Sequence, residues 1–110
     1  MKKLLFICSR NRLRSPTAEA IFSEYEGLEV DSAGLDRDAE NILDSEAVQW
    51  ADIIFVMEKS HRKKLSAKFG AWLKNKRVIC LDIPDNYEYM DPALVELLKK
   101  KVLPILKIET

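Results

Sequence analysis

The sequence predicts an α/β fold, a single doubly wound domain of three layers around a four-stranded parallel sheet. Three apolar runs support this prediction, because unalternating apolar segments are typical of strands buried on both faces of a parallel sheet. They are Leu4–Cys8, Ile53–Met57 and Val78–Leu81. Segments with helix-capping signals separate these runs, and the alternation of strands and helices implies right-handed crossovers.

At 110 residues the chain has room for one hydrophobic core, so we expect one domain over residues 1–110. Eighteen basic and eighteen acidic residues leave no net charge. We therefore expect neither a nucleic acid nor a membrane as partner. Two cysteines, one of them among arginines, fit a reducing cytoplasm better than a disulfide framework, and with one histidine they make no zinc site.

The first strand, Leu4–Cys8, is expected to lead into a helix. Ser15 is its expected N-cap, Pro16 its first residue and Gly27 its stop signal. A weaker strand over Leu28–Ser32 follows, ended by the Ala-Gly pair that comes next. This strand supplies the fourth member of the predicted sheet.

Three further helices are expected, each introduced by residues that can cap it. The expected caps are Asp44 and Ser45 for SEAVQWA, Ser60 for HRKKLSAKFG, and Asp91 with Pro92 for ALVELLKKKVLPIL. Gly70 marks the end of the second of these helices, and Pro104 is expected to kink or end the third. His61 then falls in the exposed first turn of its helix.

The reactive side chains gather in CSRNRLRS, between the first strand and the first helix. Backbone N–H groups of this loop, together with a helix N-terminus and the guanidinium of Arg14, suit a tetrahedral oxyanion. The same surroundings favour Cys8 as a thiolate. Ser15 can donate its hydroxyl to that sulfur, and Asn11 readily accepts the left-handed backbone that would turn the loop inward.

The sequence therefore predicts a phosphate-binding loop after the first strand, at the sheet edge where open α/β sheets place their active sites. Its expected members are Ser9, Arg10, Asn11, Arg12, Leu13, Arg14 and Ser15. For Arg10 and Arg12, solvated loop charge explains the residue as well as contact with substrate does.

LLFICSRNRLRSPTAEAIF resembles the opening of the low-molecular-weight protein tyrosine phosphatases, where a strand leads into Cys-x2-Asn-x2-Arg-Ser-Pro-x-Ala-Glu. The matching residues are Cys8, Asn11, Arg14, Ser15, Pro16, Ala18 and Glu19. VDSAG and ADIIFVMEKSHRKKL also resemble segments of this family, in the family's order. The resemblance implies a cysteine-dependent phosphoric monoester hydrolase that needs no metal or other cofactor.

The resemblance also implies a general acid in the segment LDIPDNYEYMDP. Asp85 aligns best with the family's acid, and Tyr87 with its tyrosine at the pocket wall. Cys8 would attack phosphorus to give a phosphocysteine while Asp85 protonates the leaving oxygen. Arg14 would stabilise the transition state.

Other readings of the second half stay open. Asp91 is better explained as a helix N-cap, and Asp82 as an anchor of the loop. Cys80 is expected to be a small buried residue of a strand. As a resolving thiol it would instead suit an arsenate reductase-like enzyme of the same fold, although such enzymes use a pair of further cysteines. A non-catalytic phosphate-binding module would keep the loop without using Asp85 as an acid.

The chain is about a quarter shorter than the family's usual length, which lies near the size mode of protein domains. The shortage falls between Gly34 and Ala51, where the family has a longer loop and helix beside the pocket. We therefore expect a shallower, more open entrance. Phosphotyrosine in a protein is the expected substrate, a small phosphate ester the alternative, and inorganic phosphate the product.

Overall fold

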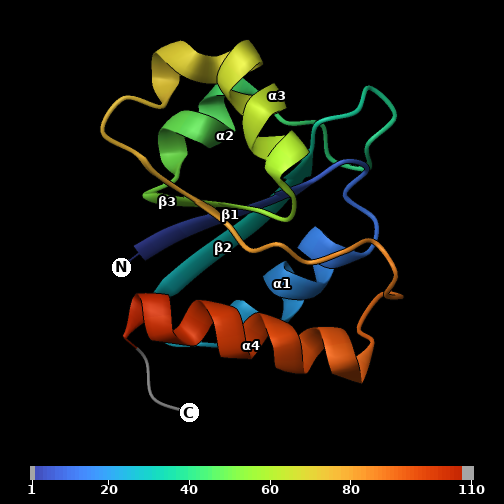
Figure 1. Cartoon of the computed structure of the whole chain (residues 1–110). Helices are drawn as coiled ribbons and strands as arrows, with labels where there is room; N and C mark the ends of the chain where they lie inside the picture. Colours follow the sequence, from blue (N-terminus) through green and yellow to red (C-terminus); the bar gives the residue numbers. More distant parts are fainter. Residues whose placement is uncertain (1, 108–110) are drawn as a thin grey trace.

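The computed structural model describes residues 2–107 and has the predicted α/β architecture (Figure 1). Four parallel strands form one sheet in the order β2-β1-β3-β4. The strands are β1 (Lys2–Cys8), β2 (Leu28–Gly34), β3 (Ile53–Val56) and β4 (Arg77–Cys80). The helices are α1 (Arg14–Phe22), α2 (Ser45–Trp50), α3 (Lys59–Phe69) and α4 (Pro92–Leu106), with a 3₁₀ turn η1 at Gly70–Trp72.

The helices cover both faces of the sheet, with α2 and α3 on one face and α1 and α4 on the other (Figure 1). The position of the central strand β1 explains why apolar and polar residues do not alternate in its sequence. Leu4, Phe6 and Cys8 belong to the core on the α1–α4 side, whereas Leu5 and Ile7 belong to the core on the α2–α3 side. All five side chains are buried, so both faces of the strand must be apolar.

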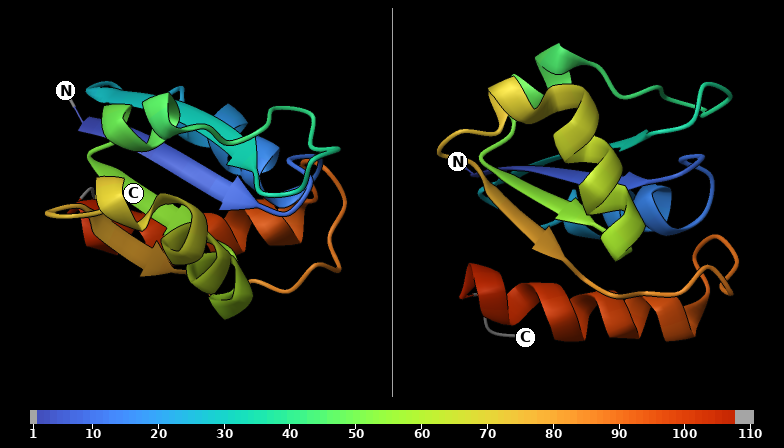
Figure 2. Two further views of the ribbon diagram at one scale, coloured as in Figure 1. Left: turned by 90° about the horizontal axis from the view of Figure 1, so that it is seen from above. Right: turned by 45° about the horizontal axis from the view of Figure 1, so that its top comes forward.

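The chain changes direction across the sheet at β1, because β2 pairs with one edge of this strand and β3 with the other. The register sets Ile7 beside Val56, so the carboxyl ends of β1 and β3 are neighbours. All four strands point the same way, and the loops that follow them gather at one edge (Figure 2). Ligands of open α/β sheets bind at such a switch point.

The first helix differs from the sequence-based expectation at both ends. It begins at Arg14, and its N-cap is Leu13, which makes no side-chain cap hydrogen bond. Ser15 is therefore not the N-cap; its hydroxyl points to the side chain of Cys8 instead. The helix ends at Phe22, and Gly27 lies in the turn before β2 with a φ of 82°.

The start of α3 was also mispredicted. Its N-cap is Glu58 rather than Ser60, so the helix starts at Lys59. His61, expected to be exposed, is only 1% exposed and faces the loop that follows β1. At the other end Gly70 keeps a right-handed helical conformation, because the chain continues directly into η1.

Two of the expected helix caps are confirmed. The carboxylate of Asp44 accepts from the Ala47 N–H at 2.8 Å, and that of Asp91 from the Ala93 N–H at 2.9 Å, as N-caps do. Pro104 does not end α4, which continues to Leu106. The strand β2 is longer than expected, because its last two residues also pair with β1.

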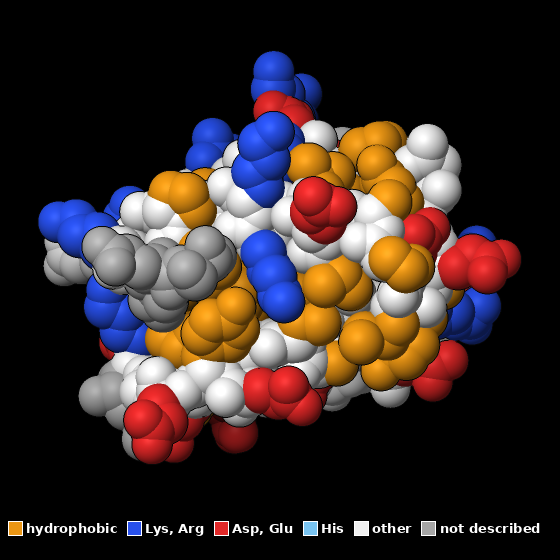
Figure 3. Space-filling model, turned by 90° about the horizontal axis from the view of Figure 1, so that it is seen from below, with side chains coloured by type: hydrophobic (Ala, Val, Ile, Leu, Met, Phe, Trp, Pro, Cys, Tyr) orange, Lys and Arg blue, Asp and Glu red, His pale blue; other side chains and the backbone are white. Residues whose placement is uncertain are grey.

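Charges of both signs are interspersed with hydrophobic side chains on the face that carries α4 (Figure 3). This mixture agrees with a chain of zero net charge. Within residues 2–107, the structure contains no helix that combines the length and the apolar character needed to cross a bilayer.

Candidate active site

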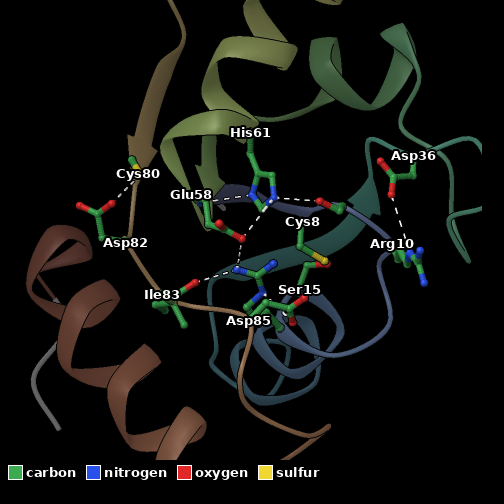
Figure 4. A network of polar contacts seen from close by, with 12 residues as sticks. Cys8, Arg10, Ser15, Asp36, Glu58, His61, Cys80, Asp82, Ile83 and Asp85 are labelled. Atoms are coloured by element: carbon green, nitrogen blue, oxygen red, sulfur yellow. Dashed lines mark hydrogen bonds and ion pairs between the residues drawn. The ribbon is translucent and has the colours of Figure 1, made fainter.

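A cavity of about 470 Å³ opens at the carboxyl edge of the sheet, beside the end of β1 (Figure 4). Its lining residues are Cys8, Ser9, Arg10, Arg12, Leu13, Arg14, Asp36 and Asp85. The structure thus gathers most of the predicted loop around one space. The two remaining loop residues, Asn11 and Ser15, are buried and do not line it.

The sulfur of Cys8 receives two hydrogen-bond donors. The backbone N–H of Asn11 lies 3.2 Å from Sγ, and the hydroxyl oxygen of Ser15 lies 2.8 Å from it. The side-chain amide of Asn11 donates to that same hydroxyl oxygen at 2.9 Å, so the proton of Ser15 is free to point at the sulfur. Donors aimed at sulfur stabilise its anionic form.

Asn11 has the left-handed backbone that the sequence predicts, with a φ of 56°. Its side chain also donates to Ser32 Oγ at 2.9 Å, and Ser32 in turn donates to the carboxylate of Glu19. This buried chain of hydrogen bonds ties the loop to α1 and to β2. The turn that brings Asn11 N–H toward the sulfur is therefore fixed from both sides.

The guanidinium of Arg14 is buried, with 3% of its side chain exposed. Its Nη1 donates to Glu58 Oε2 and to the carbonyl oxygen of Ile83, each at 2.7 Å. Its Nε lies 3.6 Å from Asp85 Oδ1. These partners compensate a buried positive charge that would otherwise be costly, and they orient its donors.

Sequence reasoning missed Glu58 and His61. The Glu58 N–H donates to His61 Nδ1 at 3.1 Å, and His61 Nε2 lies 3.1 Å from Ser9 Oγ. Burial first, and then the charge of Arg14, lowers the pKa of His61 below its ordinary value of 6.5, while Glu58 acts in the opposite sense. A sequence signal for these two residues was present. Glu58 directly follows a buried strand, and it can form a reciprocal capping pair with His61, the third residue of the helix.

The segment after β2 lies against the phosphate loop. Its backbone N–H groups at Leu35, Asp36 and Glu40 donate to the carbonyl oxygens of residues 8, 9 and 10, at 3.0, 2.9 and 3.0 Å. The approach is close at Gly34, where an added Cβ would lie 2.5 Å from the Cβ of Ala39 and 2.7 Å from the carbonyl oxygen of Ser9.

The same segment supplies carboxylates to the two rim arginines. Arg10 Nε lies 3.9 Å from Asp36 Oδ2, and Arg12 Nε lies 3.5 Å from Glu40 Oε1. Both arginine side chains are about half exposed, at 60% and 48%. Exposed pairs of this kind contribute little to stability, so both guanidinium groups remain available to a bound anion.

Of the three candidate aspartates, Asp85 alone lines the cavity. Asp91 caps α4, and Asp82 accepts from Cys80 Sγ at 3.5 Å outside the cavity. Tyr87, expected at the pocket wall, instead packs against the core on the α1–α4 side and does not line the cavity. Cys80 is partly exposed rather than buried, because β4 is the edge strand of the sheet.

Residues 3–51 match the family described as low molecular weight phosphotyrosine protein phosphatase. A search of curated proteins finds no match. Forty solved chains or more have a similar structure. The family is described as a phosphatase family, and several of the similar structures are named phosphatases.

Three of these structures indicate how far the similarity extends. The YwlE arginine phosphatase from Geobacillus stearothermophilus aligns with a TM-score of 0.77 and 20% identity, over 97% of this chain and 94% of the other. Wzb from Vibrio vulnificus, in complex with benzylphosphonate, gives 0.78 and 23%, over 96% and 97%. A YwlE mutant from Bacillus subtilis gives 0.72 and 25%, over 97% and 99%. These structures confirm the predicted fold, and the family match to residues 3–51 agrees with the resemblance seen in the sequence.

Proposed function

We propose that the chain is a member of the low-molecular-weight protein tyrosine phosphatase family, a cysteine-dependent phosphatase that acts through a phosphocysteine intermediate. One observation carries the proposal. The side chains of Cys8, Arg14 and Asp85 line the same cavity, and Ser15 Oγ lies 2.8 Å from the sulfur. A nucleophile, an anion-binding guanidinium and a carboxyl group in one pocket are what the cleavage of a phosphate ester requires.

In the first proposed step, the Cys8 thiolate attacks phosphorus. An S–P bond forms, and the bond from phosphorus to the leaving oxygen breaks. Asp85, as a carboxylic acid, transfers its proton to that oxygen. Arg14 and the backbone N–H groups of residues 9–15 bind the equatorial oxygens, where negative charge gathers in the transition state.

In the second proposed step, water attacks the phosphocysteine and the carboxylate of Asp85 takes up its proton. The S–P bond breaks, inorganic phosphate leaves, and Cys8 returns to the thiolate. The hydroxyl of Ser15 donates to the departing sulfur, which makes it a better leaving group. The reaction needs no metal, since Arg14 and the loop supply the positive charge.

The default substrate is phosphotyrosine in a protein, and a phosphorylated guanidinium is the second candidate. One feature of the cavity lining supports the second candidate, although Arg10, Arg12 and Arg14 line the same space. The lining contains two carboxylates, from Asp36 and Asp85, and Leu13 is its one large apolar side chain, while Tyr87 packs elsewhere. Carboxylates attract a cationic leaving group but offer an aryl ring no apolar surface. The Geobacillus neighbour is named an arginine phosphatase.

Two other functions rank below the phosphatase. An arsenate reductase would have to pass a disulfide from Cys8 to further thiols, and Cys80 is the one other cysteine. Cys80 lies beside Asp82, away from Cys8 (Figure 4), and does not line the cavity. A phosphate-binding module without turnover would have no use for the carboxyl group of Asp85 beside Arg14.

We place this reaction in the cytoplasm, because Cys8 must remain reduced in order to act. The proposed partners are a phosphorylated protein or a small phosphate ester, with inorganic phosphate as product, and neither a nucleic acid nor a membrane. We also infer that residues 1–110 act as one domain.

The test is the hydrolysis of an aryl phosphate as a function of pH. Wild type is compared with Cys8→Ser and Asp85→Asn, and with Asp82→Asn as a matched control. We expect Cys8→Ser to be inactive and Asp85→Asn to lose about a hundredfold in kcat, together with the dependence of kcat on a protonated acid. Asp82→Asn should behave as wild type, because its carboxylate lies outside the cavity.

An inactive wild type that still binds phosphate would reject the enzyme in favour of a binding module. The substrate class is tested separately, by comparing kcat/KM for phosphotyrosine and phosphoarginine peptides in wild type and Asp36→Asn. If the guanidinium is the leaving group, Asp36→Asn should lower kcat/KM several-fold for phosphoarginine alone. An equal effect on both peptides would reject that candidate.

A further inference from the structure

The buried histidine of α3 has a defined hydrogen-bonding state. A backbone N–H can only donate, so Nδ1 of His61 must accept from the Glu58 N–H, 3.1 Å away. The proton of the neutral ring is then on Nε2, which donates to Ser9 Oγ at 3.1 Å. The tautomer thus follows from the partners of the two nitrogens.

Burial and the nearby Arg14 favour the neutral ring of His61. Its pKa is lowered mainly by burial and next by Arg14 and Lys64, whereas Glu58 and Asp36 raise it. Its Nε2 also lies 3.7 Å from Glu58 Oε2. A neutral ring is what the two hydrogen bonds require, because a protonated one could not accept from the Glu58 N–H.

The partner of His61 lies at the cavity. Ser9 directly follows Cys8 in the chain and lines the same cavity. Because Ser9 Oγ accepts the Nε2–H of His61, its own hydroxyl proton is free for another acceptor. The hydrogen bond to His61 holds the Ser9 oxygen in place and therefore limits the directions in which the hydroxyl proton can point.

We propose that His61 is a positioning residue, which holds Ser9 so that the Ser9 hydroxyl donates a hydrogen bond to the bound phosphoryl group. This inference rests on the proposed function, because it assigns a donor to the anion that the cavity binds. His61 itself does not touch the substrate. It acts from α3 on a loop that follows β1, across the switch point of the sheet.

The same first turn of α3 also carries the carboxylate that holds Arg14, since Glu58 Oε2 lies 2.7 Å from Nη1. Glu58 and His61 lie close together at the start of α3 (Figure 4). They thus fix the two proposed donors to the anion, Arg14 and Ser9. His61 and Glu58 serve different donors, so the contribution of each can be separated by mutation.

The experiment measures the dissociation constant for inorganic phosphate by calorimetry. The proteins are wild type, His61→Ala, Ser9→Ala and the double variant. A hydrogen bond to an anion is worth enough to change affinity roughly tenfold. We expect each single substitution to weaken binding by about five- to tenfold, whereas adding His61→Ala to Ser9→Ala should cost less than about twofold. Ser60→Ala, an exposed neighbour on the same turn, is the control and should bind as wild type.

Equal losses from His61→Ala in both backgrounds would overturn the inference, since His61 would then act without Ser9. Unchanged binding in either single variant would overturn it too. If wild type binds phosphate but the variants behave in one of these ways, the inference alone fails. If wild type binds no phosphate, the proposed function fails as well.

A second measurement covers the case in which His61→Ala does not fold. The ring nitrogen resonances of this one histidine can be followed by NMR in the intact protein. The Nε2 resonance should shift when phosphate is added to wild type and should not shift in Ser9→Ala. An Nε2 resonance that ignores phosphate in wild type, or that responds equally in Ser9→Ala, would overturn the inference.

Discussion

Glu58 Oε2 lies 2.7 Å from Nη1 of Arg14, and this ion pair joins the loop after β3 to the loop after β1. The register of the sheet makes the pair possible, because it sets the ends of the two strands side by side. Arg14 is almost fully buried, whereas Glu58 is 42% exposed. The buried guanidinium is therefore anchored by a partly exposed carboxylate, and Arg14 also lines the cavity.

Replacement of this carboxylate by an amide should impair the reaction more than binding. In Glu58→Gln the guanidinium loses a charged partner, which loosens its orientation but also raises its attraction for anions. The stronger attraction acts on the bound substrate and on the transition state alike, whereas the loss of orientation costs most in the transition state, which needs donors in a defined geometry. Steady-state kinetics should show kcat reduced roughly tenfold, or about 1.4 kcal/mol, with a smaller change in KM. Glu46→Gln, at an exposed helix start, is the control, and a KM effect larger than the kcat effect would refute the prediction.

The hydroxyl of Ser15 should matter most when the thiolate leaves. Ser15→Ala removes a donor that lies 2.8 Å from Cys8 Sγ, while Asn11 keeps its bond to Ser32. A hydrogen bond to a charged group is worth about 1.5–3 kcal/mol, so kcat should fall roughly tenfold or more. Because the second step slows most, stopped-flow measurement should reveal a burst of released alcohol.

Ser23→Ala removes a hydroxyl from the far end of α1 and serves as the control for this variant. If Ser15→Ala slows the first turnover and the steady state by the same factor, without a burst, the hydroxyl does not assist the departure of the thiolate.

A methyl group at Gly34 should destabilise the fold and distort the phosphate loop. The added Cβ would lie 2.5 Å from Ala39 Cβ and 2.7 Å from the Ser9 carbonyl oxygen, so backbone must move. Overpacking of this kind costs about 1–3 kcal/mol. Urea unfolding of Gly34→Ala should show a loss of that size, together with weaker phosphate binding.

The control for this prediction is Gly70→Ala. Gly70 has an ordinary helical conformation, with nothing within 4 Å of an added Cβ. Its replacement should leave stability unchanged or slightly raised. Equal stability of the two variants would show that the segment after β2 does not press on the loop.

The lowered pKa of His61 makes folding stability depend on pH. The pKa of His61 is lower in the folded protein than the ordinary value of 6.5 expected for the unfolded chain. Between these two pKa values the histidine is protonated in the unfolded state but not in the folded state, so the unfolded state binds more protons. The free energy of unfolding should therefore fall as the pH is lowered from about 7 through 6.5, until the folded pKa is reached. The slope is at most about 1.4 kcal/mol per pH unit.

Urea unfolding of wild type and His61→Gln is measured in steps of about one pH unit, from about pH 7.5 to about pH 5. The difference between the two proteins isolates this contribution. The chain has one histidine, so the slope should be smaller in the variant. Identical slopes would mean that His61 is not kept neutral by the fold.

Much of the fold could be predicted from local patterns. The unalternating runs at β1 and β3 identified strands buried on both faces, and Asp44 and Asp91 were recognised as helix caps. The caps of α1 and α3 were mispredicted for different reasons. Ser15 is a good cap locally, but a tertiary contact assigns its hydroxyl to the sulfur of Cys8. Ser60 is a good cap locally too, but Glu58 forms a reciprocal capping pair with His61 and starts α3 earlier.

The candidate site divides in the same way. The sequence by itself determined the groups contiguous in the chain, from Cys8 to Ser15, and the left-handed turn at Asn11, because their spacing along a strand–loop–helix unit already implies an anion site. Only the tertiary structure decided that Glu58 and His61 face that loop and that Tyr87 turns to the core. Those positions depend on which strands are neighbours in the sheet, and a pairing of strands far apart in sequence leaves no local pattern to read.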